Sequence, residues 1–219
     1  MASARRSRVL LVSGGVLILA GLAVLGYVGW QFFGTTWVSE RRHAAVVEEL
    51  EKGWESGEAA VTTDQGNADA IIRVPRFGDD YAVPVLEGTS DDVLASGFGH
   101  FDGTAKPGAV GNFALAGHRI THGEPLRDMP ALEVGDEVIV ETAKTIFTYE
   151  MVTAGDALTV PFTAGWVLDP VPTNPEKGGV QPPQDTDQRL LTLTTCSELF
   201  HTDDRLIAFA VLVERERRG

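Results

Sequence analysis

An unbroken apolar run stands near the start of the chain. Residues 9–33 are nearly all apolar or Gly and carry no charge, a length that can cross a bilayer as a helix. Arg5, Arg6 and Arg8 precede the run, so the positive-inside rule predicts that residues 1–8 stay in the cytoplasm. A cleaved signal peptide is the alternative, although its apolar region is usually shorter, about 7–15 residues. The pattern predicts a single-pass cell-membrane protein with the rest of the chain outside the cytoplasm.

The next segment has the periodicity of an amphipathic helix. Over residues 40–54, apolar side chains recur at three- and four-residue steps, at Ala44, Val47, Leu50 and Trp54. The other face is charged, and residues 55–67 that follow have the Gly, Ser, Thr and acidic composition of a linker. We therefore expect residues 34–69 to form a helical stalk and a flexible linker. A peripheral helix of the following domain is the alternative.

From residue 70 onward, short apolar runs alternate with Gly, Pro and Asp. The runs with strand character are residues 71–74, 81–85, 112–116, 137–141, 145–152, 189–195 and 206–213. Helical patterns are confined to residues 90–96 and 125–129. The series of short strands predicts an all-β domain over residues 70–219, either a barrel or a sandwich. The Pro-rich residues 161–188 are expected to form a long loop, and such loops are often functional.

Composition and charge narrow the class of protein. The 219 residues, 43% hydrophobic and 22% charged, suit one globular domain with an appendage. A net charge of −13 repels phosphates, so nucleic acid is not an expected partner. The histidines lack the spacings of zinc sites, so neither a metal nor a cofactor is predicted. Calcium at the acidic pairs Asp79–Asp80 and Asp91–Asp92 is kept as an alternative.

Cys196 is the only cysteine of the chain. Oxidising compartments favour paired cysteines, so a single free thiol outside the cytoplasm indicates intermolecular pairing or a reactive role. A small buried hydrophobe is the alternative interpretation. Cys196 directly follows the predicted strand 189–195. In this position the strand would fix the backbone of a nucleophile while its side chain stays accessible to a substrate.

A thiol nucleophile needs a base, because the thiolate is the attacking species. His118 follows the predicted strand 112–116 much as Cys196 follows its own strand, which favours it as the acid/base group. His122 and His201 lie in loops and stay open as alternatives, whereas His43 in the stalk is expected to be too remote.

Arg205 begins the last predicted strand, residues 206–213. A reaction that passes through an oxyanion needs a fixed positive or donor group. Hairpin-like pairing of this strand with the one before it would bring Arg205 beside Cys196. The alternative is a solvated Arg205 paired with Asp203 or Asp204.

Three segments together resemble the sortase family: residues 108–119 (GAVGNFALAGHR), 192–196 (TLTTC) and 205–207 (RLI). They occur in the family's order of His, Cys and Arg. The resemblance implies an eight-stranded β-barrel, which with short helices would follow the transmembrane helix predicted from residues 9–33. It also implies a site in which Cys196 is the nucleophile, His118 the acid/base and Arg205 the charge stabiliser.

The same resemblance implies a cysteine transpeptidase. Its substrates would be surface proteins with a C-terminal sorting signal, cleaved between Thr and Gly, and its acceptor an amine of a peptidoglycan precursor. Thr195 would help to bind the substrate or the oxyanion, and Thr194 is also expected to bind the substrate. A pilin-polymerising sortase, a cysteine hydrolase and a non-catalytic extracellular β-barrel binding module on a membrane stalk are the alternatives.

Within the family, residues 99–108 (GHFDGTAKPG) and 121–126 (THGEPL) resemble class E, the actinobacterial housekeeping type. That type commonly has Tyr where this chain has His122, which is expected to contact the substrate. The resemblance implies a preference for a Leu-Ala-x-Thr-Gly signal over Leu-Pro-x-Thr-Gly.

Overall fold

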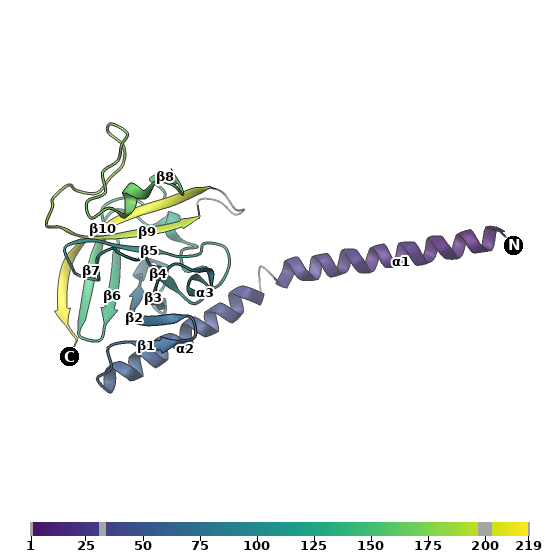
Figure 1. The fold of residues 1–219 in the computed structure, drawn as a ribbon, viewed down its shortest axis with the longest axis horizontal. Helices are drawn as coiled ribbons and strands as arrows, with labels where there is room; N and C mark the ends of the chain where they lie inside the picture. Colours follow the sequence, from purple (N-terminus) through teal and green to yellow (C-terminus); the bar gives the residue numbers. More distant parts are fainter. Residues whose placement is uncertain (1, 31–33, 197–202, 219) are drawn as a thin grey trace.

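The computed structural model describes residues 2–30, 34–196 and 203–218, with side chains for all of these except residues 2–12 and Cys196. Two helices, α1 (Ala2–Gly29) and α2 (Thr35–Glu55), precede a β-barrel, and α1 projects away from it (Figure 1). Among the residues with described side chains, no helix combines the length and the apolar character needed to cross a membrane.

Within the described residues, eight strands close into a barrel in the order β2–β3–β4–β5–β9–β10–β7–β6, and β6 pairs back onto β2. Their bounds are β2 (Gly66–Arg73), β3 (Val83–Glu87), β4 (Phe98–His100), β5 (Gly111–Ala116), β6 (Glu137–Thr142), β7 (Thr145–Met151), β9 (Arg189–Cys196) and β10 (Asp204–Arg217). Strand β1 (Val61–Thr63) extends the sheet beside β2, and β8 (Leu158–Pro161) pairs with β10. The expected eight-stranded β-barrel is confirmed.

Every segment expected to be a strand contributes to this barrel, and three short strands were not expected. Strands β1, β4 and β8 have only 3 or 4 residues each, too few to display a clear alternation of apolar and polar side chains. Strand β8 begins just before the expected long loop, and the 3₁₀ helix η4 (Gly165–Leu168) lies within that loop.

One of the two short helices differs from expectation. Helix α3 (Asp91–Leu94) forms as predicted, and the Ser90 side chain accepts a hydrogen bond from the Val93 N–H at its N-terminus. Residues 125–128 form turns, followed by the 3₁₀ helix η3 (Met129–Ala131). The reason is local: the Leu126 N–H donates to the His118 carbonyl at 3.0 Å, so it is bound to the end of β5.

The barrel interior is filled by alternating side chains from its strands. Phe98, Phe113, Leu191 and Leu193 are all at most 2% exposed and belong to one cluster. Tyr149 is fully buried there, and its hydroxyl accepts a hydrogen bond from the Gly108 N–H at 2.7 Å. Burial raises the pKa of Tyr149 to about 12, so the phenol stays neutral inside the barrel.

Strand β9 is covered on its outer face as well. Thr192 donates to the Asn112 side chain at 2.7 Å, and the Asn112 amide donates to the Val167 carbonyl of η4 at 2.9 Å. Beside this network, Val167 packs in a second apolar cluster with residues of β8 and β10. Thr192 on the polar face of β9 is therefore buried but hydrogen-bonded, which satisfies its hydroxyl and helps to fix the strand.

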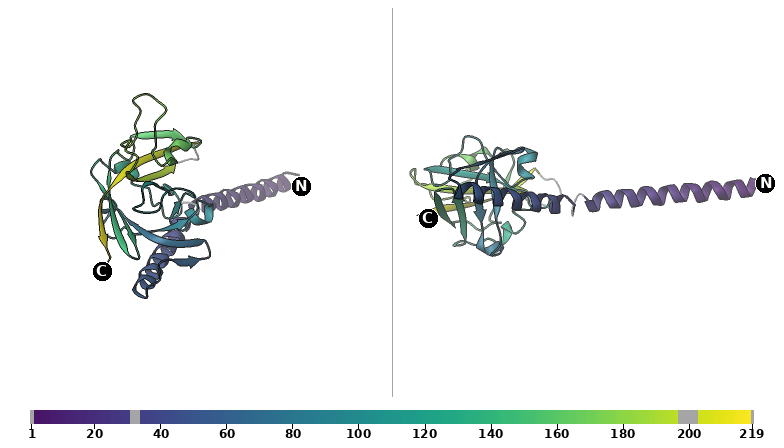
Figure 2. Two further views of the ribbon diagram at one scale, coloured as in Figure 1. Left: turned by 60° about the vertical axis from the view of Figure 1, so that its left-hand side comes forward. Right: turned by 90° about the horizontal axis from the view of Figure 1, so that it is seen from below.

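Helix α2 packs along the barrel in the views of Figures 1 and 2. Its apolar face buries Val46, Val47 and Leu50 against β1, β2, β3 and α3, in a cluster completed by Val61, Ala68, Ile71, Leu86 and Val93. The helix ends in a Schellman motif: the Glu58 N–H donates to the Gly53 carbonyl at 2.9 Å, and the Gly57 N–H to the Trp54 carbonyl at 3.2 Å. Gly57 permits this end because its φ is +89°.

This packing differs from the expected stalk and linker. Helix α2 lies against the barrel, as a peripheral helix of the domain would, because its apolar stripe has a partner surface on the first strands. Strand β1 and the start of β2 fall inside residues 55–69, where a flexible linker was expected. The division of the chain into domains itself stays a prediction.

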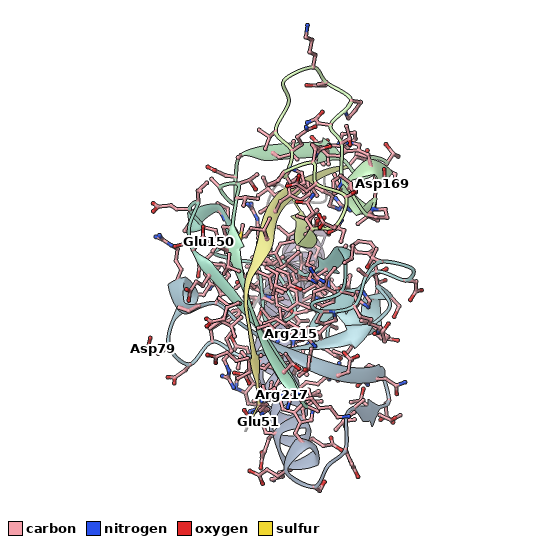
Figure 3. The ribbon with its side chains drawn as sticks, turned by 90° about the vertical axis from the view of Figure 1, so that its left-hand side faces the viewer. Glu51, Asp79, Glu150, Asp169, Arg215 and Arg217 are labelled. Atoms are coloured by element: carbon pink, nitrogen blue, oxygen red, sulfur yellow. The ribbon has the colours of Figure 1, made fainter. Side chains whose placement is uncertain are left out.

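The C-terminal end of α2 is tied to the end of the barrel. Figure 3 shows Arg217 on the C-terminal half of β10 near Glu51 at one end of the molecule, and Asp169 beside η4 toward the other end. Arg218 donates to Glu141 at 3.1 Å, and its guanidinium lies 4.4 Å from the centroid of the Trp54 ring. Arg218, the residue that follows β10, thus helps to hold α2 in place.

Candidate active site

Three strand ends meet at one edge of the barrel. Strands β5 and β9 are parallel, with Ala116 opposite Thr194, so both end at this edge. Strand β10 is antiparallel to β9 and starts there, with Arg205 opposite Cys196 in the register. Beyond β5, the Gly117 N–H donates to the Thr194 carbonyl at 3.1 Å. The backbone of Cys196 therefore lies between Arg205 and the segment that enters His118.

The chain just before His118 is fixed on both sides. Thr195 is 3% exposed, and its hydroxyl donates to the Gly117 carbonyl at 2.7 Å. A Cβ on Gly117 would lie 3.0 Å from Phe98 and 3.1 Å from Leu126, so this residue has little room for a side chain. Thr195 thus ties the end of β9 to the end of β5. The substrate-binding role expected for Thr194 and Thr195 stays a prediction.

His118 and His122 lie together at this edge. Both are half-buried, and their rings stack with centroids 4.9 Å apart and planes inclined by 29°. Burial, and then the nearby Arg42 charge, lower the pKa of His122, against a smaller opposing effect of Asp91. Of the histidines considered as the base, the structure thus brings two to the end of β5, and His201 lies outside the described residues.

Arg205 is half-buried at the start of β10. Its guanidinium donates to the Asp204 carbonyl at 3.0 Å, and its backbone is also in register with Val160 of β8. Pairing on both sides fixes the backbone from which this side chain extends. Hairpin-like pairing of Arg205 with Cys196, expected from the sequence, is confirmed for the backbone; the role of each residue stays a prediction.

His43 was expected to be remote, and this expectation is wrong. It is 4% exposed, and a Cβ on Gly123 of the loop after His118 would lie only 2.6 Å from its ring. Burial, and then the charges of Arg42 and His118, lower its pKa to about 4, while a hydrogen bond to the Ala95 backbone opposes the shift. A signal was available: His43 lies one turn before Val46 and Val47, on the apolar face of the helix.

His100, the remaining histidine, is buried away from solvent. Its Nδ1 lies 3.3 Å from a Glu87 carboxylate oxygen, its Nε2 3.0 Å from the Ala105 carbonyl, and its ring centroid 5.0 Å from that of Phe113. These contacts hold residues 99–108 against the barrel wall. In the part of the chain that the structure describes, no group of three or more His, Cys, Asp or Glu is placed to bind a metal ion.

Comparison with known proteins agrees with this fold. Residues 72–213 match the family model described as the Sortase domain. Sortase SrtE1 of Streptomyces coelicolor is 36% identical over 94% of this chain. The structure of sortase E from Streptomyces avermitilis is 40% identical, with a TM-score of 0.59, over 71% of this chain and 93% of that one. Sortase E1 from Streptomyces coelicolor, solved with a tripeptide in its active site, is 36% identical, with a TM-score of 0.57, over 72% and 94% of the two chains.

The described chain is thus a closed eight-stranded barrel in which the ends of β5 and β9 and the start of β10 meet at one edge. The chain belongs to the sortase family, and its similarity to sortases of type E agrees with the resemblance to class E in the sequence. The chain spans 58% of the length of SrtE1.

The buried His43 predicts a loss of stability in acid. Its pKa of about 4 in the folded chain lies below its ordinary value of 6.5, so the folded state binds fewer protons than the unfolded state between these values. The free energy of unfolding should therefore fall as the pH drops through this window. His43 alone should account for a loss of about 3 kcal/mol at pH 4. Urea unfolding at pH 7 and pH 4 measures the loss, and His43→Gln should lose less than the parent. Equal losses would show that His43 is not buried in its neutral form.

Proposed function

We propose that the chain is a membrane-anchored cysteine transpeptidase that processes surface proteins. It cleaves a C-terminal sorting signal of the Leu-Ala-x-Thr-Gly or Leu-Pro-x-Thr-Gly kind between Thr and Gly. It then joins the new carboxyl end to an amine of a peptidoglycan precursor. The observation that carries the proposal is the register at the end of β9, where Cys196 is opposite Arg205 and next to the segment entering His118, in a chain of the sortase family.

In the first half of the reaction, the Cys196 thiolate attacks the carbonyl carbon of the signal's Thr. The carbonyl oxygen gains negative charge, which the Arg205 guanidinium stabilises with fixed donors. As the C–N bond breaks, His118 as the acid donates a proton to the leaving Gly amine. The products are a thioester on Cys196 and a free peptide that begins with Gly.

In the second half, the acceptor amine attacks the thioester carbonyl, and His118 takes the proton that the amine loses. The C–S bond breaks, and the sulfur leaves as the thiolate that began the cycle. An amide forms between the substrate and the acceptor. The two steps balance without a cofactor or a metal, because one amine replaces another on the same acyl group.

Thr194, Thr195 and His122 complete the proposed substrate site. The hydrogen bond from Thr195 to Gly117 supports a role in holding the two strand ends against the bound signal. The stacking of His122 on His118 supports a role for His122 beside the signal's second residue, where Ala has a backbone N–H that Pro lacks.

We also propose that residues 9–33 anchor the chain in the cell membrane as a single span, with the barrel outside the cytoplasm. The support is the uncharged apolar run with Arg5, Arg6 and Arg8 before it. This location would place the site where surface proteins and peptidoglycan precursors meet.

Replacing the three proposed catalytic residues should remove transfer without unfolding the barrel. Cys196→Ala is expected to abolish transfer of a signal peptide to an amine, and His118→Ala to reduce it by several orders of magnitude. Arg205→Lys should lose about 10²-fold, because an ammonium lacks the planar set of donors of a guanidinium. The assay is mass spectrometry of the products, with Tm measured for each variant.

His201→Ala serves as the matched comparison for His118→Ala and should cost far less. Transfer retained by Cys196→Ala with a parent-like Tm would contradict the mechanism and favour a binding module. A larger loss in His201→Ala than in His118→Ala would move the acid/base role to His201.

The parent should prefer a Leu-Ala-x-Thr-Gly peptide over a matched Leu-Pro-x-Thr-Gly peptide. Proline has no N–H, and a site that pairs with that N–H rejects it. The imidazole of His122 has a shorter reach than a Tyr phenol, so His122→Tyr should widen the preference. The measurement is kcat/KM for both peptides with both proteins. A parent that favours the Pro peptide tenfold or more would refute this specificity while leaving the chemistry intact.

Membrane topology can be tested directly on cells. Protease added outside spheroplasts should digest the chain from about Val38 onward and leave the N-terminal segment protected. Permeabilised spheroplasts provide the control for access. Full protection of the barrel in intact spheroplasts would reverse the predicted orientation.

A further inference from the structure

The loop after His118 contains a turn in an unusual conformation, residues 121–124, called here the His122 turn. Three successive residues have left-handed backbone angles: φ is 57° at His122, 79° at Gly123 and 48° at Glu124. Glycine adopts this conformation freely, but His and Glu are rarely found there. Two such residues in one turn persist only where the surroundings hold them.

Helix α2 supplies those surroundings from outside the barrel. The Thr36 hydroxyl donates to Glu124 Oε1 at 3.2 Å. A Cβ on Gly123 would lie 2.6 Å from the His43 ring and 3.4 Å from Cβ of Ser39, so the turn is packed directly on the helix. Because Thr36, Ser39 and His43 are spaced by three and four residues, they lie on one face of α2.

The other side of the His122 turn is held by the barrel. The Leu126 N–H donates to the His118 carbonyl at 3.0 Å, and the Tyr81 hydroxyl donates to the Pro125 carbonyl at 2.6 Å. The turn is thus held between α2 and the strand end that carries His118. Its His122 ring stacks on His118 as a result.

The buried residues of α2 change character along the helix. Toward the C-terminus the buried side chains are Val46, Val47 and Leu50, but at the His122 turn they are the polar Ser39 and His43. A buried imidazole stabilises a fold less than an apolar side chain of similar size would, unless its polar atoms are paired. The His43 ring interacts with the Ala95 backbone, but in the described part of the chain its Nε2 is buried without a hydrogen-bond partner. Packing alone does not explain a histidine at this position.

Building on the proposed function, we propose that Thr36, Ser39 and His43 of α2 are positioning residues for substrate specificity. They fix the His122 turn, and the turn sets His122 against His118 beside the bound sorting signal. With its low pKa, His43 is neutral at pH 7, so it acts by its shape and contacts rather than by charge. His43→Gln, which is neutral and of comparable reach, should therefore preserve more of the parent's behaviour than His43→Ala.

The test is a double-mutant cycle between His43 and Gly123 in the purified full-length chain. kcat and KM are measured with matched Leu-Ala-x-Thr-Gly and Leu-Pro-x-Thr-Gly peptides and an amine. We expect His43→Ala to change the ratio of the two kcat/KM values by about threefold or more, within the range of coupling between contacting residues. Gly123→Ala should be less harmful in the His43→Ala background, where its new methyl group has room.

Val46→Ala is the matched control, because Val46 is a buried residue one turn further along α2, within the apolar contact with the first strands. It should lower Tm while leaving the peptide ratio unchanged. A ratio unchanged in His43→Ala, or changed equally by Val46→Ala, would overturn the proposal and make α2 a purely structural helix.

A second readout does not depend on turnover. NMR titration of His122 should show its pKa rising toward the ordinary value in His43→Ala, because loosening the turn exposes the ring to water. Val46→Ala should leave that titration unchanged. If the parent transfers neither peptide, the proposed function fails, but the titration still decides whether α2 positions His122. An unchanged His122 titration in His43→Ala would overturn the positioning role.

Discussion

The parallel pairing of β5 with β9 is the constraint on which the site depends. Parallel strands end at the same edge of a sheet, so this single pairing brings the segment entering His118 to Cys196. The antiparallel return of β10 places Arg205 on the other side. The hydrogen bond from Thr195 to Gly117 extends the pairing one residue beyond the ladder, up to His118 itself. A shift in this register would separate the three residues while leaving the barrel closed.

Rigidity at this edge comes from covering β9 on both faces. Its leucines fill the barrel, and its Thr192 hydroxyl is satisfied through Asn112 by the backbone of η4. A strand with a polar outer face would ordinarily meet water. Here the segment around β8 and η4 buries that face, and the hydrogen bonds offset the cost of removing its hydroxyls from water. The strand that carries the proposed nucleophile therefore has little freedom to move.

The sequence predicts the parts of this arrangement better than their assembly. Strands of five or more residues show their alternation, so β2, β3, β5, β6, β7, β9 and β10 could all be recognised, whereas β1, β4 and β8 are too short. Periodicity also identified α2, but it cannot tell whether an apolar stripe packs against its own barrel or elsewhere. For this reason His43 was wrongly expected to lie far from the site. Left-handed angles at His122 and Glu124 could not be predicted either, since neither residue favours them.

The packing of α2 also changes where the boundary of the functional unit falls. The family match begins at residue 72, after α2 has ended. A barrel defined by that match contains the ends of β5, β9 and β10 but lacks the surface that supports the His122 turn. Since two non-glycine residues of the turn hold an unfavourable conformation, removing their support would let them relax toward ordinary angles and carry His122 away from His118. The chemistry would then remain with the barrel, while the discrimination between signals would depend on the helix that leads into it.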